Sequence, residues 1–268
     1  MSRLKDILYG VGIEQVVGST GVDVRGIEFD SRQIGLNDIF VAIKGRVFDG
    51  HHFIKQACDQ GAIAIICEIL PDIIINGITY VQVTDTTAAL AYLGDNFYHQ
   101  PSKELILIGV TGTNGKTTVA TLLHELFSDL GFLSGLLSTV KNKICDQVLP
   151  ATHTTPDALT IHRTLRNMVD KGVTHCFMEV SSHGIDQNRT LALDFDGGIF
   201  TNLTHDHLDY HKNFRTYRDV KKRFFDQLKS KAFALTNQDD KNGSFMLQNS
   251  KARTFTYAQK SLADFKVQ

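Results

Sequence analysis

The chain of 268 residues has little of what marks a secreted, membrane-spanning or disordered protein. Its four cysteines lie far apart and form no C-x-x-C pair, so neither a disulfide framework nor a cysteine zinc site is indicated. No stretch approaches the roughly 20 apolar residues that a membrane-spanning helix needs. The N-terminal sequence MSRLKDILYG lacks the apolar core of a signal peptide. We therefore expect a cytoplasmic protein that does not insert into a membrane.

Charge of one sign and proline are also scarce. Lysine and arginine number 28 against 29 aspartates and glutamates, and this net charge of −1 argues against a broadly basic nucleic-acid surface. With 21 glycines but only four prolines, the chain has no Pro-rich linker and is typical of an α/β protein with tight turns. Hydrophobic residues make up 42%, enough for a sizeable core, and the length suggests two domains.

The first hundred residues have the pattern of a small α/β domain. The apolar run AIAIIC at 62–67 predicts a strand buried on both faces. Asp85 is predicted to cap a helix that runs through Tyr98. We place a domain boundary at Pro101, because the residue before a proline disfavours helical geometry. Further strands are predicted at 25–29, 38–43 and 78–83, with a helical stretch around 53–58.

The second segment opens with LILIGV at 105–110, a predicted buried strand that leads into TGTNGKTT and a helix over 116–130. Strands then alternate with helices, and this order predicts a mostly parallel, doubly wound sheet. The later strands are predicted at 174–180, 198–201 and 232–236, with helices around 159–169 and 217–228.

The turn between the first strand and helix of this segment has the composition of a phosphate-binding loop. Glycines let backbone N–H groups turn toward phosphate oxygens, and the start of the next helix adds a positive dipole. Lys116 is suited to neutralise β- and γ-phosphate charge, and the Thr117 hydroxyl is suited to ligate Mg²⁺. The common pattern has a glycine where this chain has Val110, so the loop is G-x-x-G-x-x-G-K-T.

Acidic and histidine side chains gather after two later strands. Glu179 lies at the C-terminal end of the predicted strand HCFMEV, and ligand sites of open α/β sheets form at such strand ends. The stretch TNLTHDHLDYH at 201–211 follows the next strand, and its imidazoles and carboxylates include candidate metal ligands. Within it, His207 is the candidate ligand, whereas we expect His205 and His211 to be surface residues of a polar loop.

Together these motifs resemble the Mur ligases, and within that family the MurE type. MurF-type ligases are less similar, because NLTHDHLDYH and SSHGIDQNR look MurE-like, and folylpolyglutamate synthetases lack the D-S-R front domain. The motifs that carry the resemblance are GVTGTNGKTT, HTTPD, MEVSSHG, QNR and TNLTHDHLDYH in the second segment, and FDSR at 29–32, DIFVAIKG at 38–45 and DGHHFI at 49–54 in the first.

The resemblance implies a fold and a reaction. The fold is α/β, with a small UDP-substrate-binding domain at 1–100 and a P-loop, doubly wound, mostly parallel ATP-binding domain at 101–268 that is incomplete. The implied reaction uses ATP to phosphorylate the D-Glu carboxylate of UDP-MurNAc-L-Ala-D-Glu, and the amine of meso-diaminopimelate or L-lysine then attacks the acyl phosphate. The cofactors are ATP and Mg²⁺, the partners are these substrates rather than nucleic acid, and the expected oligomeric state is a monomer.

It also implies roles for residues that match the family motifs. Lys116, Glu179, His207 and Lys221 are the implied catalytic set. The implied Mg²⁺ ligands are Thr117, Glu179, His207 and Lys221. The resemblance also implies that Lys221, the lysine of Y-x-x-x-K, is carbamylated. Without the resemblance, Lys221 and Lys222 would be interpreted as a solvated helix face. The implied nucleotide contacts are Gly112, Thr113, Asn114, Gly115, Lys116, Thr117, Thr118 and Asn237, although Asn237 also suits a plain turn. Phe29, Ser31, Arg46 and Val47 correspond to positions near the uridine, and Thr154, Thr155, Ser181, Gln187 and Arg189 to positions near the muramoyl dipeptide.

Two other hypotheses stand beside a complete ligase. Members of the family have a C-terminal domain with a D-N-P-R-like motif, and this sequence lacks the motif. We therefore expect a truncated chain. The first alternative hypothesis is a fragment that binds nucleotide and UDP-sugar but does not complete catalysis. A P-loop nucleotide switch is disfavoured, because it would not need the D-S-R domain.

Overall fold

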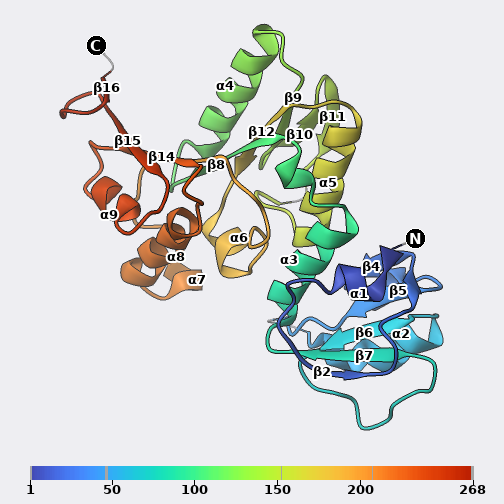
Figure 1. Ribbon diagram of the computed structural model, residues 1–268. Coiled ribbons are helices and arrows are strands. Elements are labelled where there is room, and N and C mark those ends of the chain that lie inside the picture. The colour runs from blue at the N-terminus through green and yellow to red at the C-terminus, as the bar shows by residue number, and fades with distance from the viewer. Residues whose placement is uncertain (1, 46–47, 152, 207, 267–268) are drawn as a thin grey trace. The chain divides into compact units, whose positions relative to one another are not determined.

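The computed structural model describes residues 2–45, 48–151, 153–206 and 208–266, without the side chains of residues 208 and 209. Contacts divide the chain into two compact units, Met1–Gln100 (unit 1) and Pro101–Gln268 (unit 2). Figure 1 shows both as layers of helices and strands. Within the described ranges no helix is long and apolar enough to cross a membrane.

Unit 1 is built on a five-stranded sheet with the order β2-β7-β6-β5-β4. Its strands from β4 to β7 run parallel, and β2 pairs with β7 in antiparallel fashion. All four residues of β6 are buried, which confirms the strand predicted from AIAIIC. The elements are β1 (Ser2–Arg3), α1 (Leu4–Ile7), β2 (Ile13–Val17), β3 (Asp23–Val24), β4 (Gly26–Glu28), β5 (Asp38–Val41), α2 (Ile54–Asp59), β6 (Ala64–Cys67), β7 (Thr79–Val83) and α3 (Thr86–Phe97).

The capping prediction for α3 is confirmed. The Asp85 carboxylate accepts hydrogen bonds from the backbone N–H groups of Thr87 and Ala88 at 2.8 and 3.0 Å. These bonds satisfy two of the donors that a helix start leaves without intrahelical partners. The cap places α3 directly after β7, and the helix ends before Pro101.

Unit 2 contains a nine-stranded sheet with the order β11-β10-β9-β12-β8-β13-β14-β15-β16. From β9 to β16 neighbouring strands run parallel, which confirms the predicted mostly parallel sheet. The strands are β8 (Ile106–Thr111), β9 (Ser134–Leu137), β10 (Lys141–Ile144), β11 (Gln147–Pro150), β12 (His175–Glu179), β13 (Gly197–Phe200), β14 (Phe233–Asn237), β15 (Arg253–Ala258) and β16 (Phe265–Lys266).

Helices cover this sheet on both faces. In Figure 1, α4 lies above β12 and β8, whereas α8 and α9 lie below the sheet. Alternate residues of the central strands therefore join different cores: Ile108 and Val110 pack in the core with Ala120 of α4, and Leu107 packs in the core with Phe224 of α8. The helices are α4 (Lys116–Asp129), α5 (Ala158–Asp170), α6 (Ser182–Asp186), α7 (Leu208–His211), α8 (Phe214–Asp226) and α9 (Gly243–Leu247).

The hairpin of β10 and β11 was not predicted from the sequence. The two strands pair in register from Lys141↔Pro150 to Ile144↔Gln147, so the turn between them is Cys145 and Asp146. Cys145 has a φ of 52°, a conformation in which asparagine or glycine is usual. Without either residue in the turn, the sequence carries no hairpin signal.

Candidate functional site

The phosphate-loop sequence forms a tight turn between β8 and α4. Gly115 precedes the helix with a φ of 85°, and α4 starts at Lys116. Gly109 of the motif has a different role: a Cβ there would lie 2.5 Å from the Phe224 ring, so this glycine lets α8 pack on the sheet. Gly112 is the glycine of the loop itself, with a φ of 153° and no room for a side chain.

The end of β13 supports this loop from the side. Thr201 Oγ1 donates to the Asn114 carbonyl at 2.6 Å, and Asn202 Nδ2 donates to the same carbonyl at 3.1 Å. In return, the Asn202 side-chain oxygen accepts the Asn114 backbone N–H at 3.0 Å. Neither Thr201 nor Asn202 was predicted from the sequence to contact the loop. Their signal is a polar pair directly after a buried strand that pairs with β8.

Two lysines from different helices converge on the loop. Lys116 Nζ donates to the carbonyls of Gly112 and Thr113 at 3.0 and 2.8 Å. Lys221 Nζ of α8 donates to the same Gly112 carbonyl at 2.9 Å, and its side chain is 1% exposed. The interpretation of Lys221 and Lys222 as a solvated helix face is therefore wrong: both are buried residues of α8, inside unit 2.

Burial acts on the pKa of both lysines in the same direction. Burial lowers the pKa of Lys116, although Glu179 and Asp206 act in the opposite direction. The pKa of Lys221 is lowered well below its usual value, first by burial and then by the nearby Lys116 charge, with Asp206 opposing. Removing an amine from water favours its uncharged form. Lys221 is thus the more strongly perturbed of two adjacent amines.

Glu179 ends β12 inside unit 2, with no exposed surface. One carboxylate oxygen accepts the Thr139 backbone N–H at 2.8 Å, and the Thr139 hydroxyl donates within 3.2 Å of both oxygens. Buried carboxylates are retained where such donors or a cation compensate for lost water. The Glu179 charge also acts on Lys116, where it opposes the lowering of the pKa by burial.

The carboxyl end of β12 also organises several predicted substrate residues. Thr155 Oγ1 donates to the Glu179 backbone carbonyl at 2.8 Å and accepts the Ser181 N–H at 2.9 Å. Arg189 donates to the Thr155 carbonyl at 2.5 Å and, through two nitrogens, to Gln187 Oε1 at 3.0 and 2.6 Å. Burial lowers the Arg189 pKa. Hydrogen bonds thus connect four of the predicted substrate residues: Thr155, Ser181, Gln187 and Arg189. Thr154, which precedes Thr155 in the chain, is half-buried.

The histidines differ from expectation in one case. His205 is exposed, as expected, and stacks on Phe214 with ring centroids 4.8 Å apart. His211 was expected at the surface, but it is 3% exposed and its Nε2 lies 2.9 Å from Ser182 Oγ. It is buried because α7 carries it onto α6, next to the Tyr217 ring.

The predicted Mg²⁺ ligands are only partly within the described residues. His207 lies outside them, and in the part of the chain that the structure describes no three His, Cys, Asp or Glu side chains form a metal-binding group. The oxygen donors that remain are the Glu179 carboxylate and the hydroxyl of Thr117, at the half-buried start of α4. Hard oxygen donors of this kind suit Mg²⁺.

The remaining nucleotide candidates lie in the loop, in the first turn of α4 and at the end of β14. Gly115, Asn114 and Thr118 are exposed, whereas Thr113 is buried with its hydroxyl 3.1 Å from the Tyr217 hydroxyl. Asn237 ends β14, and its Nδ2 donates to the Thr201 carbonyl at 3.0 Å. It thus contacts the segment that supports the phosphate loop.

Unit 1 has a separate pocket of about 720 Å³. It is lined by Phe29 and Ser31, two of the predicted uridine contacts, and Ser31 Oγ donates to Gln56 Oε1 at 3.1 Å. Arg46 and Val47, also predicted there, lie outside the described residues, although Gly45 and Phe48 on either side of them line the pocket. Phe48, Phe53 and Gln56 line it without having been predicted.

Comparison with known families and proteins shows what the chain is similar to. Residues 110–268 match a family model described as Mur ligase middle domain, and residues 23–98 match one described as Mur ligase family, catalytic domain. The chain is 52% identical over 265 residues to a UDP-N-acetylmuramoyl-L-alanyl-D-glutamate--2,6-diaminopimelate ligase of Cytophaga hutchinsonii, and 49% identical over 264 residues to one of Phocaeicola vulgatus. Both alignments cover 98% of this chain and 54% of the relative.

Solved structures show the same likeness. A structure of a UDP-N-acetylmuramoyl-L-alanyl-D-glutamate--2,6-diaminopimelate ligase aligns with a TM-score of 0.82 at 26% identity, over 99% of this chain and 54% of that one. A MurF structure from Acinetobacter baumannii aligns with a TM-score of 0.64 at 23% identity, over 91% of this chain and 49% of that one, and shares the fold. The chain spans about half the length of the curated relatives it matches.

Proposed function

The chain belongs to the Mur ligase family, and on that premise we propose that it carries the UDP-substrate and ATP sites of a MurE-type ligase. The proposed reaction joins a diamino acid to the D-Glu of UDP-MurNAc-L-Ala-D-Glu in peptidoglycan synthesis. The names of the relatives specify 2,6-diaminopimelate, which we therefore favour over L-lysine. Such an enzyme acts in the cytoplasm on soluble substrates.

One observation carries the proposal: Lys116 and Lys221 both donate to the Gly112 carbonyl of the phosphate loop, and the Glu179 charge acts on Lys116. A carboxylate that attacks a triphosphate brings like charges together, so the site must supply opposing charge and fixed donors. Lys116 at the start of α4 supplies the cation next to the loop. Lys221 adds a second, buried amine at the same carbonyl, and Glu179 adds a buried carboxylate.

In the proposed reaction an oxygen of the D-Glu carboxylate attacks the γ-phosphorus of ATP, and the bond from that phosphorus to the bridging oxygen breaks, releasing ADP. The uncharged amine of the diamino acid then attacks the acyl carbon, and the bond from that carbon to the phosphate oxygen breaks. Phosphate leaves, the nitrogen loses one proton to water, and an amide results. The loop N–H groups hold the phosphates, and Arg189 grips a carboxylate or phosphate of the substrate. Mg²⁺, when bound, would withdraw charge from the phosphate oxygens; Thr117, Glu179, His207 and Lys221 would hold it.

In this proposal Lys221 is carbamylated. A buried amine with a lowered pKa has its lone pair free to attack the carbon of CO₂. One proton leaves the nitrogen, and a carbamate anion results. The side chain thereby becomes an anion whose oxygens are ligands of the type that Mg²⁺ prefers.

A second candidate function is a fragment that binds nucleotide and UDP-sugar without turnover. The observation that favours it is the share of the relatives, 54%, that this chain spans. Both candidates use the same two sites, so a binding experiment alone does not separate them.

The test is phosphate release by the chain with ATP, UDP-MurNAc-L-Ala-D-Glu and diaminopimelate, with L-lysine as the alternative amine. A complete ligase releases phosphate only when all three substrates are present. No turnover with retained binding of both nucleotides supports the fragment. Loss of both bindings would contradict the proposal that this chain carries the UDP-substrate and ATP sites. Lys116→Met is expected to abolish ATP-dependent turnover, and Lys241→Met, on an exposed loop, serves as the matched control.

A further inference from the structure

His51 in unit 1 connects two segments through the two nitrogens of its ring. Its Nδ1 lies 2.6 Å from an Asp49 carboxylate oxygen. Its Nε2 accepts the backbone N–H groups of Glu68 and Ile69 at 2.9 and 3.3 Å. Only 12% of the side chain is exposed. The ring therefore joins the 3₁₀ turn η2 (Gly50–Phe53) to the residues that follow β6.

These partners determine which ring nitrogen carries the proton. A backbone N–H group can only donate, so Nε2 must offer its lone pair to Glu68 and Ile69. In a neutral ring the proton is then on Nδ1, which donates to Asp49 in a hydrogen bond. Hydrogen bonds from the backbone N–H and the ring of His51 lower the pKa of Asp49 and keep this acceptor ionised. One neutral tautomer thus satisfies both sides of the ring.

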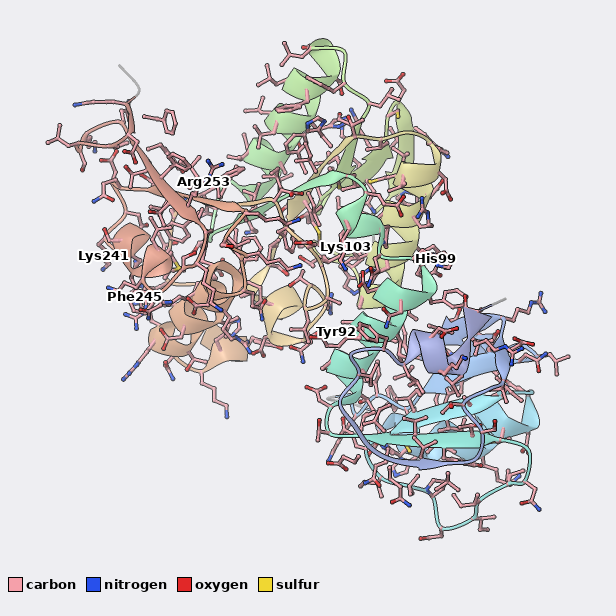
Figure 2. The ribbon with its side chains drawn as sticks, viewed as in Figure 1. Tyr92, His99, Lys103, Lys241, Phe245 and Arg253 are labelled. Carbon is pink, nitrogen blue, oxygen red and sulfur yellow. The ribbon has the colours of Figure 1, made fainter. Side chains whose placement is uncertain are left out.

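Glu68 is held in place by β6, β7 and α3. It directly follows β6, and its carbonyl accepts Gln82 Nε2 of the neighbouring strand β7 at 3.0 Å. One oxygen of its carboxylate accepts the backbone N–H and the hydroxyl of Thr86 at 3.0 and 2.8 Å. Thr86 is the first residue of α3, the helix on which Figure 2 labels Tyr92. Glu68 is therefore the fixed partner of the contact with His51.

The turn η2, the other partner of this contact, carries part of the unit 1 pocket. Gly50 and Phe53 both line that pocket. The Gly50 N–H donates to the Ile43 carbonyl, beyond the end of β5, at 2.8 Å. A Cβ on Gly50 would lie 2.7 Å from the Ile43 nitrogen, so the two segments pack backbone to backbone. Because β5 and β6 are parallel neighbours, Ile43 and Glu68 hold η2 at the same edge of the sheet.

We propose that His51 is a positioning residue of the unit 1 pocket, whose neutral ring holds Gly50 and Phe53 where they line the UDP site. The inference rests on the proposed function, because it takes this pocket as the UDP site. A proton on Nε2 would remove the acceptor on the β6 side, whereas the contact with Asp49 would remain. The turn η2 would then lose its connection to β6. Affinity for the UDP substrate should therefore fall as the pH is lowered.

The charged groups near the ring are engaged in contacts of their own. Asp49 and the exposed His52 belong to the same segment as His51. From the neighbouring elements, the Glu68 carboxylate is bonded to the start of α3, and the Asp85 carboxylate caps that helix. In the part of unit 1 that the structure describes, Asp49 is thus the charged group that contacts the ring, and a proton gained there changes the contact with β6.

The experiment is an isothermal titration of the chain with UDP-MurNAc-L-Ala-D-Glu at about pH 8 and at about pH 5.5, a range over which imidazole gains its proton. The carboxyl groups of the ligand, with ordinary pKa values of about 4, stay largely ionised in this range. We expect wild type to bind at least about fivefold more weakly at the lower pH, because the fraction of chains with a neutral ring falls.

The variant His51→Gln separates positioning of the pocket from simple support of the fold. The amide oxygen of glutamine can accept the Glu68 N–H but gains no proton in this range. We expect His51→Gln to bind as tightly as wild type at the higher pH and to lose most of the pH dependence. His51→Ala, which has no acceptor, should bind weakly at both pH values. His52→Gln, at the exposed neighbouring position in η2, is the matched control and should keep the pH dependence of wild type.

The position of the proton is tested without ligand. Histidine ¹⁵N NMR of the chain at the higher pH should show a ring with protonated Nδ1 and unprotonated Nε2, in resonances that His51→Gln removes. A protonated Nε2 would overturn the inference. Equal affinity of wild type at the two pH values would overturn it as well, and so would the same pH dependence in His51→Gln as in wild type.

Failure of wild type to bind the UDP substrate at the higher pH would contradict the proposed function, and hydrogen exchange then decides the role of His51. We expect the amides of residues 50–53 and 68–69 to exchange faster in His51→Ala than in wild type, because the contact between η2 and β6 is lost. Unchanged exchange in both segments would overturn the inference.

Discussion

The Thr201 hydroxyl donates to the Asn114 carbonyl at 2.6 Å, across 87 residues of sequence. This bond joins the end of β13 to the phosphate loop at the end of the neighbouring strand β8. A loop that presents N–H groups to phosphates needs its carbonyls held away from the ligand, and Thr201 holds one of them. Preorganisation of the loop therefore depends on a residue outside the loop motif.

Thr201→Val tests that dependence. Valine keeps the volume but removes the donor, so the Asn114 carbonyl retains only its bond from Asn202. We expect the affinity for ADP to fall roughly tenfold, about 1.4 kcal/mol. Isothermal titration measures this change, with Thr254→Val on the exposed part of β15 as control. Equal affinities in wild type and Thr201→Val would show that the loop holds its shape alone.

Gly112→Ala is expected to be more damaging. A Cβ at this position would lie 1.9 Å from Thr201 Oγ1 and 3.0 Å from the Asn202 carbonyl, so the loop or the end of β13 must move. Nucleotide binding should become undetectable in titrations that saturate wild type. At Gly12 a Cβ would have an ordinary contact of 3.7 Å with Thr84 Oγ1, so Gly12→Ala should bind normally. A Gly112→Ala variant with wild-type affinity would contradict the geometry of the loop.

Carbamylation of Lys221 makes a spectroscopic prediction. With ¹³C-bicarbonate at neutral pH or above, the chain should show a carbamate carbonyl resonance that Lys221→Met removes and Lys222→Met keeps. Because burial lowers the Lys221 pKa, the reactive uncharged amine is present at a pH where an exposed lysine is protonated, and the signal should fall as the pH is lowered. A signal that survives in Lys221→Met would assign the carbamate elsewhere.

The unit 1 pocket makes a prediction about UDP. Phe53 lines the pocket, so Phe53→Ala removes apolar contact area from any base bound there. We expect roughly tenfold weaker UDP binding, about 1.4 kcal/mol. Ile73→Ala, 78% exposed in the same unit, should bind UDP as wild type does. If both variants bind UDP equally well, the uridine site lies elsewhere.

Asp194 predicts an acid-dependent part of the stability. Burial opposes its ionisation, but hydrogen bonds from Lys229 and Lys231 at 3.0 and 3.2 Å outweigh burial, and its pKa lies below 3.8. A lowered carboxyl pKa stabilises the fold above the unfolded pKa and loses that contribution as the pH falls through the folded one. Asp194→Asn should therefore lower the free energy of unfolding by about 1 kcal/mol at pH 7. The difference should shrink as the pH falls below 3.8. Urea unfolding at several pH values measures it, and a constant difference would contradict the assignment.

Local signals predicted much of the fold. The β-branched run of β6 and the Asp85 cap depend on neighbouring residues only, so the sequence contains all that determines them. The alternation of strands and helices along unit 2 was sufficient to predict that its sheet is mostly parallel. The hairpin of β10 and β11 was missed because Cys145 occupies a turn conformation without the residues that usually signal it.

The site was predictable where a motif is continuous and less so where partners are distant. The burial of His211 depends on Ser182, 29 residues earlier, and that of Lys221 on Gly112, 109 residues earlier. Hydropathy places both side chains in solvent, and only the family resemblance singled out Lys221. The roles proposed for Glu179, His207 and the substrate residues remain predictions.

The most direct test of the central claim is a sequential equilibrium titration of the chain, first with Mg·ADP and then with UDP-MurNAc-L-Ala-D-Glu. We predict that one equivalent of each ligand binds, and that a chain saturated with Mg·ADP still binds UDP-MurNAc-L-Ala-D-Glu. The reason is that the loop after β8 holds the ADP, whereas the unit 1 pocket holds the uridine. Competition between the ligands for one site, or failure of UDP-MurNAc-L-Ala-D-Glu to bind, would contradict it.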